Sequence, residues 1–246
     1  MIEIKMFKQI DLSGYTFIEG FPGAGLVGPM AISYIVDKLK LEYVGYMKSS
    51  DFPPLVSIHK NEPMPPIRIY CSTEGKGDRI VTIFAEFAIP LELISAISDT
   101  IYKFIKDNGI SSIYSIGGIP VEKMTSTVFV LASTSKMLAA AQSAGLKSVG
   151  EGVATGVSAM LLINSTFDKL PDMNIMVPIL PDTITPKYAE QAIESLDKFI
   201  KLNIDLGELE KESQQVEAKI RDIVSKHRES HNTLKKDIYA GPSLYA

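Results

Sequence analysis

Four closely spaced glycines near the N-terminus could form a turn that binds a nucleotide. They lie in the stretch GFPGAGLVG, residues 20–28, which follows a short apolar run and contains the pattern G-x-G-x-x-G. The glycines are Gly20, Gly23, Gly25 and Gly28. In a dinucleotide-binding fold, such glycines let the backbone approach a pyrophosphate at the N-terminus of a helix. An acidic residue about 20 positions later, at the end of the second strand, then binds the ribose.

The residues after this turn do not continue the dinucleotide-binding pattern. The second predicted strand, EYVGYMKSS, ends without an acidic residue, and Asp51 comes late, directly before Phe52 and two prolines. A proline-rich segment stands where a second helix would be needed, and Pro22 restricts the backbone of the turn itself. We therefore interpret the glycines as a tight strand-to-helix turn that permits close packing. We expect no cofactor, and no tight binding of NAD, FAD or ATP.

Other residue types that could carry catalysis are isolated in the sequence. Ser158, in GVSAM, lacks the second glycine of the G-x-S-x-G motif and falls in a predicted helix. Glu86 ends a predicted strand and could be an active-site carboxylate, although a loop-shaping or oligomer-contact role is favoured. Cys71 is expected to be a small strand residue and not a nucleophile. None of the three has a partner at a catalytic spacing.

The basic and imidazole side chains give no stronger signal. The histidines are His59, His227 and His231, and the arginines are Arg68, Arg79, Arg221 and Arg228. No histidine has the spacing of a metal site or a catalytic triad, so we expect surface positions for them and no bound metal. Four arginines are few for binding phosphates or carboxylates. The sequence therefore predicts a protein that is not an enzyme.

The composition is that of a water-soluble globular protein. Hydrophobic residues make up 46% and charged residues 22% of the 246 residues, and no apolar run is long enough for a transmembrane helix. The net charge of −4 argues against nucleic acid or an anionic membrane as a partner. Cys71 is the single cysteine, which excludes an intrachain disulfide. The N-terminus lacks the apolar core of a signal peptide, so we expect a cytoplasmic protein.

Hydrophobic periodicity predicts an α/β fold. Strands are expected over residues 2–8, 15–20, 42–49, 110–118, 127–133 and 173–181, and helices over residues 26–39, 91–109, 133–145, 152–166 and 185–203. The segment 51–87 holds five prolines between three short β-rich runs. Such a segment is typical of an antiparallel meander with proline-rich edges.

The sequence changes character after residue 203. Residues 205–230 are about half charged, and their apolar residues alternate every four and three positions, as in a narrow helical seam. The seam residues are Leu209, Val216, Ile220 and Ile223. Either this helix packs its seam on its own domain, or the seam forms a helical hairpin or an oligomer contact. We expect three parts, namely an α/β core domain (1–203), a charged C-terminal helix (204–230) and a flexible tail (231–246).

Several segments that occur in order resemble the proteasome assembly chaperone 2-like family. They are GFPGAGLVG, the proline-rich meander, IYSIGGIP, VGEGVATGVSAMLL and ILPDTITPKYAEQAIESLDKFIKLNIDLGELEKE, and together they cover about residues 10–230. The resemblance implies a mixed central sheet with helices on both sides, a sandwich similar to that of nucleoside phosphorylases, followed by a C-terminal helical extension. Members of this family generally lack a demonstrated catalytic site. The DTITP segment is a small departure, because relatives often carry a DP-containing stretch there.

The last three residues, Leu244-Tyr245-Ala246, fit a hydrophobic-Tyr-X ending. Proteins that dock on proteasome α-rings carry this ending, and archaeal members of the same family are among them. The ending implies a binding mode in which a lysine between subunits captures the terminal carboxylate while the tyrosine ring fills an apolar slot.

These observations lead to one functional hypothesis with two alternatives. The hypothesis is a homo-oligomeric binding protein, a trimer or tetramer, whose partner is the α-subunits or the α-ring of the proteasome. It would serve as an assembly chaperone or as an ATP-independent activator. The alternatives are a nucleoside- or nucleotide-processing enzyme that uses the Gly20–Gly28 turn, and a ligand-binding scaffold whose tail is incidental.

Overall fold

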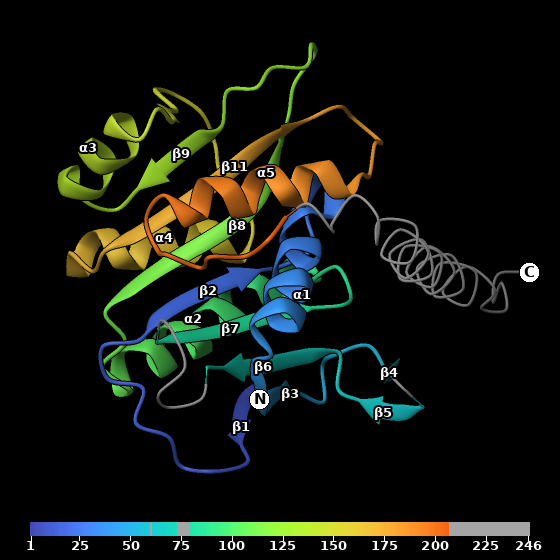
Figure 1. Ribbon diagram of the computed structural model, residues 1–246. Helices are drawn as coiled ribbons and strands as arrows, with labels where there is room; N and C mark the ends of the chain where they lie inside the picture. Colours follow the sequence, from blue (N-terminus) through green and yellow to red (C-terminus); the bar gives the residue numbers. More distant parts are fainter. Residues whose placement is uncertain (60, 73–78, 207–246) are drawn as a thin grey trace, which may run out of the picture.

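Runs rich in β-branched and aromatic residues pair into a nine-stranded mixed sheet in the computed structural model (Figure 1). The structure describes residues 1–59, 61–72 and 79–206. The strand order is β1-β3-β6-β7-β2-β8-β11-β9-β10. The strands are β1 (Glu3–Met6), β2 (Thr16–Gly20), β3 (Glu42–Lys48), β6 (Ile67–Cys71), β7 (Ile80–Ala85), β8 (Ser112–Pro120), β9 (Phe129–Ala132), β10 (Lys147–Ser148) and β11 (Asp172–Ile179). A separate hairpin pairs β4 (Ser57–His59) with β5 (Glu62–Met64).

The centre of the sheet is parallel and its two sides are antiparallel. Strands β7, β2, β8 and β11 run in the same direction. On one side β6, β3 and β1 add antiparallel strands, and on the other side β9 pairs antiparallel with β11. Parallel strands are normally covered on both faces and therefore apolar along their length. Strand β7, with the sequence IVTIFA, is buried at every position, as this rule requires.

Helices cover both faces of the sheet (Figure 1). On one face, α1 (Val27–Leu39) and α5 (Pro186–Asp197) enclose an apolar core, and α3 (Ser135–Ser143) packs beside β9 and β10. On the other face, α2 (Leu91–Asp107) and α4 (Val157–Asp168) enclose a second core. The predicted mixed α/β fold with helices on both sides is thus confirmed. No helix among the described residues is both long and apolar enough to cross a membrane.

Two predicted helix boundaries are wrong for identifiable reasons. The helix expected over 152–166 begins only at Val157, because Gly156 has φ 94°, a backbone conformation that a right-handed helix cannot include. The helix expected to reach residue 203 ends at Asp197. The Asp197 carboxylate accepts backbone N–H bonds from Leu202 (2.7 Å) and Asn203 (3.1 Å), so the chain folds back after this residue.

The proline-rich segment also differs from the simplest expectation. Its β-rich runs do pair antiparallel, since β6 pairs with β7 and β4 with β5. However, the β4–β5 hairpin stands outside the main sheet, and β10 is a short strand that the periodicity did not predict. Prolines at positions 53, 54, 65 and 66 flank the hairpin, and each lacks the backbone N–H that a further sheet pairing would need.

Candidate functional site

The glycine turn connects β2 to α1 through a short 3₁₀ helix, Ala24–Leu26. Its first and last glycines lie against each other. A Cβ atom on Gly20 would be 2.5 Å from the carbonyl oxygen of Gly28, and a Cβ on Gly28 would be 2.7 Å from the carbonyl oxygen of Ile116 on β8. No side chain fits at either position. These two glycines therefore allow the backbones of β2, α1 and β8 to approach closely.

The inner glycines of the turn have different requirements. Gly25 has φ 67°, and a Cβ there would meet the Ile179 side chain at 3.1 Å, whereas a Cβ on Gly23 would meet nothing within 4 Å. A further glycine, Gly118 on β8, completes the contact, because its Cβ would be 2.3 Å from the carbonyl oxygen of Ala24. The turn is thus packed on the ends of β8 and β11 by protein backbone. That geometry favours the packing interpretation, and the expected lack of a cofactor stays a prediction.

A buried ion-pair cluster fixes the proline-rich segment to the sheet. Arg68 on β6 is only 1% exposed and donates hydrogen bonds to the Glu86 carboxylate and to the carbonyl oxygen of Pro65. His59, on the β4–β5 hairpin, lies with its Nε2 2.9 Å from Glu86 Oε1. Burial acts to raise the pKa of Glu86, but the hydrogen bond with His59 and the charge of Arg68 lower it to about 2.

The Glu86 carboxylate is therefore ionised at neutral pH and occupied by two partners. A general acid or base needs a pKa near the operating pH and a free position facing a substrate. Glu86 has neither property, and the structure gives it the loop-shaping contacts that the sequence favours. The expected surface position of His59 is wrong in one respect, because its ring is only partly exposed and is paired. His59 and Glu86 are 27 residues apart in the chain, so no local sequence pattern could have revealed their contact.

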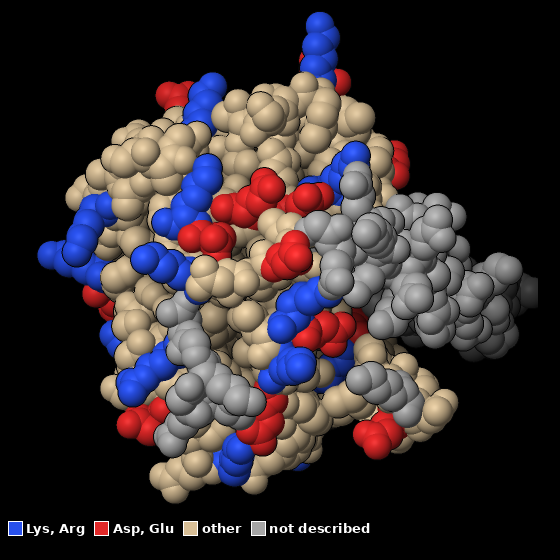
Figure 2. Space-filling view, in the orientation of Figure 1, with Lys and Arg blue, Asp and Glu red and all other residues tan. Residues whose placement is uncertain are grey.

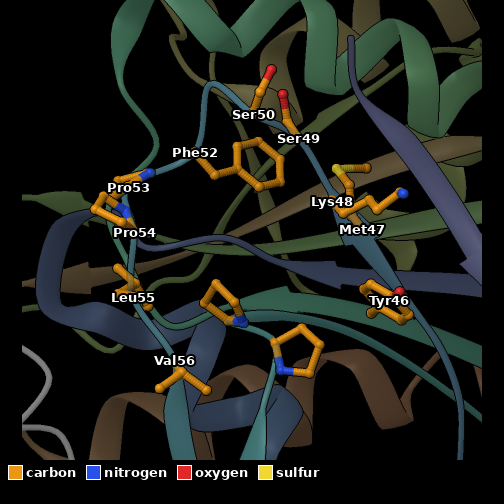
Figure 3. A pocket seen from close by; sticks show the side chains of 12 residues that line it. Tyr46, Met47, Lys48, Ser49, Ser50, Phe52, Pro53, Pro54, Leu55 and Val56 are labelled. Atoms are coloured by element: carbon orange, nitrogen blue, oxygen red, sulfur yellow. The ribbon is translucent and has the colours of Figure 1, made fainter.

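Beside this cluster lies an open apolar cleft of about 570 Å³ (Figure 3). It is lined by Tyr46, Met47, Lys48, Ser49, Ser50, Phe52, Pro53, Pro54, Leu55, Val56, Pro65 and Pro66. Figure 3 shows the ring of Tyr46 on one side of the cleft and the side chains of Leu55 and Val56 on the other. Aromatic and proline side chains form the usual surface for binding an extended apolar or proline-rich peptide. The lining has one charged group, Lys48, and no pair of groups for acid–base catalysis.

Comparison with a protein-family model identifies the family. The model of the PAC2 family matches residues 17–224, which is most of the chain. This protein belongs to the PAC2 family. An uncharacterised protein of Methanocaldococcus jannaschii is 28% identical over 236 residues, covering 93% of both chains.

Solved structures of two archaeal proteins have a similar fold. Pyrococcus furiosus PbaA, described as an archaeal homolog of proteasome-assembly chaperone, superimposes with a TM-score of 0.84 at 24% identity, covering 94% of this chain and 100% of PbaA. P. furiosus PbaB, described as an archaeal proteasome activator, gives a TM-score of 0.76 at 19% identity, covering 90% of this chain and 98% of PbaB. At these identities the similarity establishes the fold.

The remaining sequence candidates of this PAC2 protein do not converge on one site. Cys71 is buried at the end of β6, where burial raises the pKa of its thiol, so it is a poor nucleophile. Asp51 accepts hydrogen bonds from Ser49 and Ser50, and these bonds lower its pKa. Within the described part of the chain, no group of three or more His, Cys, Asp or Glu residues could hold a metal ion.

Sequence reasoning missed a set of buried polar groups beneath α4. Burial raises the pKa of Glu19 on β2, and hydrogen bonds with the Ser115 and Ser158 hydroxyls act in the opposite direction. Burial likewise raises the pKa of Asp172 on β11 to about 8, opposed by Ser165 and assisted by the Glu19 charge. One available signal was the acidic residue inside the otherwise apolar run TFIEG. Ser158, the near-miss nucleophile, is thus a neighbour of a buried carboxylate.

The predicted seam and tail cannot be placed. The seam residues Leu209, Val216, Ile220 and Ile223 and the terminal Leu244-Tyr245-Ala246 lie outside the described residues. The same is true of His227, His231, Arg221 and Arg228. On the visible face that carries α1 and α5, basic and acidic side chains are interspersed, with an acidic group over α5 (Figure 2). Among the described residues on that face, the basic side chains do not form one continuous surface.

Proposed function

We propose that this PAC2 protein binds the α-ring or α-subunits of the proteasome, as an assembly chaperone or an ATP-independent activator. Support comes from the family and from whole-chain similarity to PbaA and PbaB, which are described in those terms. In the proposal the protein is not an enzyme, acts in the cytoplasm, and works as a homo-oligomer, a trimer or tetramer.

The observation that carries the proposal is the sequence of the last three residues, Leu244-Tyr245-Ala246. A tyrosine ring supplies a large rigid apolar surface with one polar tip, and a terminal carboxylate can pair with a lysine in a pocket. The stretch from residue 229 onward would reach up to roughly 60 Å when extended. This reach would let the core domain remain outside the ring while its tail enters a pocket between two α-subunits.

The core geometry supports binding over catalysis. Glu86 is held ionised between Arg68 and His59, and Cys71 is buried with a raised pKa. Backbone contacts at Gly20 and Gly28 occupy the space that side chains, or a ligand of similar size, would need close to the turn. These groups give no support to the enzyme alternative.

A pull-down of purified α-subunits with the full chain tests the proposal. Deleting Leu244 to Ala246, or Tyr245→Ala, should weaken binding by about 30-fold or more, because one buried aromatic anchor is lost. The matched control is Tyr239→Ala, the same change six residues upstream in the same tail. A glycine added after Ala246 should also weaken binding, since it displaces the carboxylate while leaving Leu and Tyr in place.

The outcomes separate the proposed function from its alternatives. Loss of binding in the deleted and extended chains, with binding retained by Tyr239→Ala, supports tail docking. Binding that is unchanged in every variant contradicts it and favours the scaffold alternative. Circular dichroism and light scattering on each variant verify that the fold and the assembly state are the same as in the parent chain.

A further inference from the structure

Helix α4 is apolar on the side that faces away from the sheet. Its inner side is set by Val157, Leu161 and Ser165, which are buried. On the opposite side Ile163 is 43% exposed and Phe167 78% exposed. No residue from Val157 to Phe167 carries a charge. The outer side also carries exposed Thr166. Apolar side chains as exposed as Phe167 are nevertheless uncommon on the solvent side of a surface helix, and nothing among the described residues covers Phe167.

Further apolar residues close to the exposed side of α4 in the chain are also exposed. Val153, in the segment that leads into α4, is 92% exposed, and Met160 and Leu162 on the flanks of the helix are partly exposed. Single exposed apolar residues are ordinary, but a contiguous apolar patch on a soluble domain marks an interaction surface. We name the outward-facing residues Ala159, Met160, Ile163 and Phe167 the α4 face.

The charges at the two ends of this layer indicate which partner fits. Helices α2 and α4 run in the same direction, because Ser98 near the middle of α2 contacts Val157 at the start of α4, and Lys106 near the end of α2 contacts Asp168 at the end of α4. Exposed Glu92 lies in the first turn of α2, and exposed Glu151 precedes α4 by six residues in the chain. At the other end Asp168 is paired with Lys106, and exposed Lys169 directly follows α4.

We propose that the α4 face is a self-association surface that is covered by α4 of a second copy, packed antiparallel across a two-fold axis. In this arrangement the acidic starting end of one copy meets Lys169 of the partner subunit, and the uncharged centres of the helices meet each other. An isologous contact needs a surface that is complementary to itself, and the α4 face has that property. The lack of charge at its centre means that no ionised group is desolvated there.

The proposal rests on the homo-oligomer of the proposed function, and it does not involve the tail. It locates a contact in the core domain, whereas the seam at Leu209 to Ile223 would locate one in the C-terminal helix. An isologous pair accounts for a dimer, or for one of the interfaces of a tetramer with two-fold symmetry. It does not account for a trimer that has only a three-fold axis.

Cross-linking tests the geometry directly. Ile163 lies at the middle of α4, so the two copies of this residue should face each other near the two-fold axis. Under mild oxidation, Ile163→Cys should give a disulfide-linked dimer in high yield. The matched control is Ile58→Cys on β4, a residue that is 64% exposed. The native Cys71 is buried and should contribute no background.

Light scattering over a range of concentrations tests the energetics. Ile163→Glu and Phe167→Glu should each raise the dissociation constant of the assembly by at least 30-fold, as expected for loss of an apolar anchor. Ile58→Glu is the matched control and should leave the constant unchanged. Lys169→Glu should weaken the assembly, and adding Glu151→Lys to it should restore part of the loss.

Each outcome bears on the proposal. Cross-linking at position 163 but not at 58, together with the weakened assembly, supports it. A monomer at every concentration overturns it, as does an intact assembly in Ile163→Glu with no cross-link at position 163. Deletion of Leu244 to Ala246 should leave cross-linking unchanged. A failure of α-ring binding with cross-linking intact would therefore count against tail docking and not against the α4 face.

Discussion

Helices α2 and α4 lie side by side on the same face of the sheet, but they distribute their apolar and polar side chains differently. Helix α2 places apolar Ile97, Ile101 and Ile105 against the sheet, all fully buried. Its outer side carries Glu92, Asp99, Lys103, Lys106 and Asp107, all exposed. This is the ordinary pattern of a surface helix, in which one apolar stripe faces the core and the other side faces water.

In helix α4 part of this pattern is reversed, because a polar side chain faces the sheet and a large apolar side chain faces solvent. Toward the sheet it presents Ser165 as well as Leu161, and the strands below it carry Glu19 and Asp172, both fully buried. Both Asp172 carboxylate oxygens and the Ser165 hydroxyl are buried without a well-formed hydrogen bond among the described residues, although Ser165 lies close enough to Asp172 to lower the pKa of that carboxyl. Away from the sheet, α4 exposes Phe167 to solvent.

The difference teaches that folding of the isolated chain does not account for the sequence of α4. A helix selected only to stabilise this domain would bury Phe167 and expose its serines. An interaction surface on the outer side explains the exposed apolar residues. The polar groups below α4 are a cost to the stability of the isolated chain, since unpaired buried polar atoms are unfavourable. We have no physical account of why they are present.

The largest expected effect concerns Asp172 and pH. Its pKa is about 8 in the folded chain against 3.8 for an ordinary carboxyl, so between these values the native state holds a proton that the unfolded chain has lost. The free energy of unfolding should therefore fall as pH rises from about 4 to about 8, by up to about 5 kcal/mol. Asp172→Asn should flatten this part of the profile, as measured by urea denaturation at several pH values.

The matched control for this profile is Asp99→Asn on the exposed side of α2. It should keep the slope of the parent chain. Glu19→Gln should remove a further part of the slope, because burial raises the pKa of Glu19 in the same direction. A profile that rises from pH 4 to pH 8 in the parent chain would contradict the assignment of a protonated Asp172.

A smaller difference in stability is expected between substitutions on the sheet-facing sides of the two helices. Ile101→Ala on α2 removes a fully buried side chain and should cost about 2–5 kcal/mol of unfolding free energy. Ser165→Ala on α4 removes a buried hydroxyl without a well-formed hydrogen bond among the described residues, and it should change stability by less than about 1 kcal/mol. Urea denaturation at one pH measures both. Equal losses would show that Ser165 is as important to packing as Ile101.

The contrast between α2 and α4 also shows what the sequence can reveal. The spacing of apolar residues in 91–109 predicts α2 well, because its periodicity and its stop at Gly109 agree with each other. For α4 the run GVATGVSAMLLINST is apolar without a clear period, and its start is misplaced by five residues. Only tertiary structure shows that Gly156 has a positive φ. A helix with apolar residues on both its inner and its outer side shows no clear hydrophobic periodicity in the sequence.

Contacts between segments that are distant in the chain could not be predicted from the sequence for a different reason. The glycine turn could be recognised because its residues are consecutive, and the close approach of Gly20 to Gly28 is local. The pairing of Glu86 with Arg68 and His59 depends on how β6, β7 and the hairpin are arranged. The strand order β7-β2-β8 is likewise set by packing between helices and sheet, which a single sequence does not encode in any short pattern.

The smallest expected effects are on the outer sides of the two helices. Lys103 pairs with Asp107 on α2 at 2.7 Å, with both side chains largely exposed, so Lys103→Ala should cost about 0.5 kcal/mol or less. Phe167→Ser should cost as little in dilute protein, because that ring is mostly exposed. At high protein concentration the two variants should differ in melting temperature. Assembly stabilises the folded state by mass action, so the melting temperature of the parent chain and of Lys103→Ala should rise with protein concentration. The melting temperature of Phe167→Ser should not, and an identical concentration dependence in all three proteins would mean that the outer sides of α2 and α4 are equivalent after all.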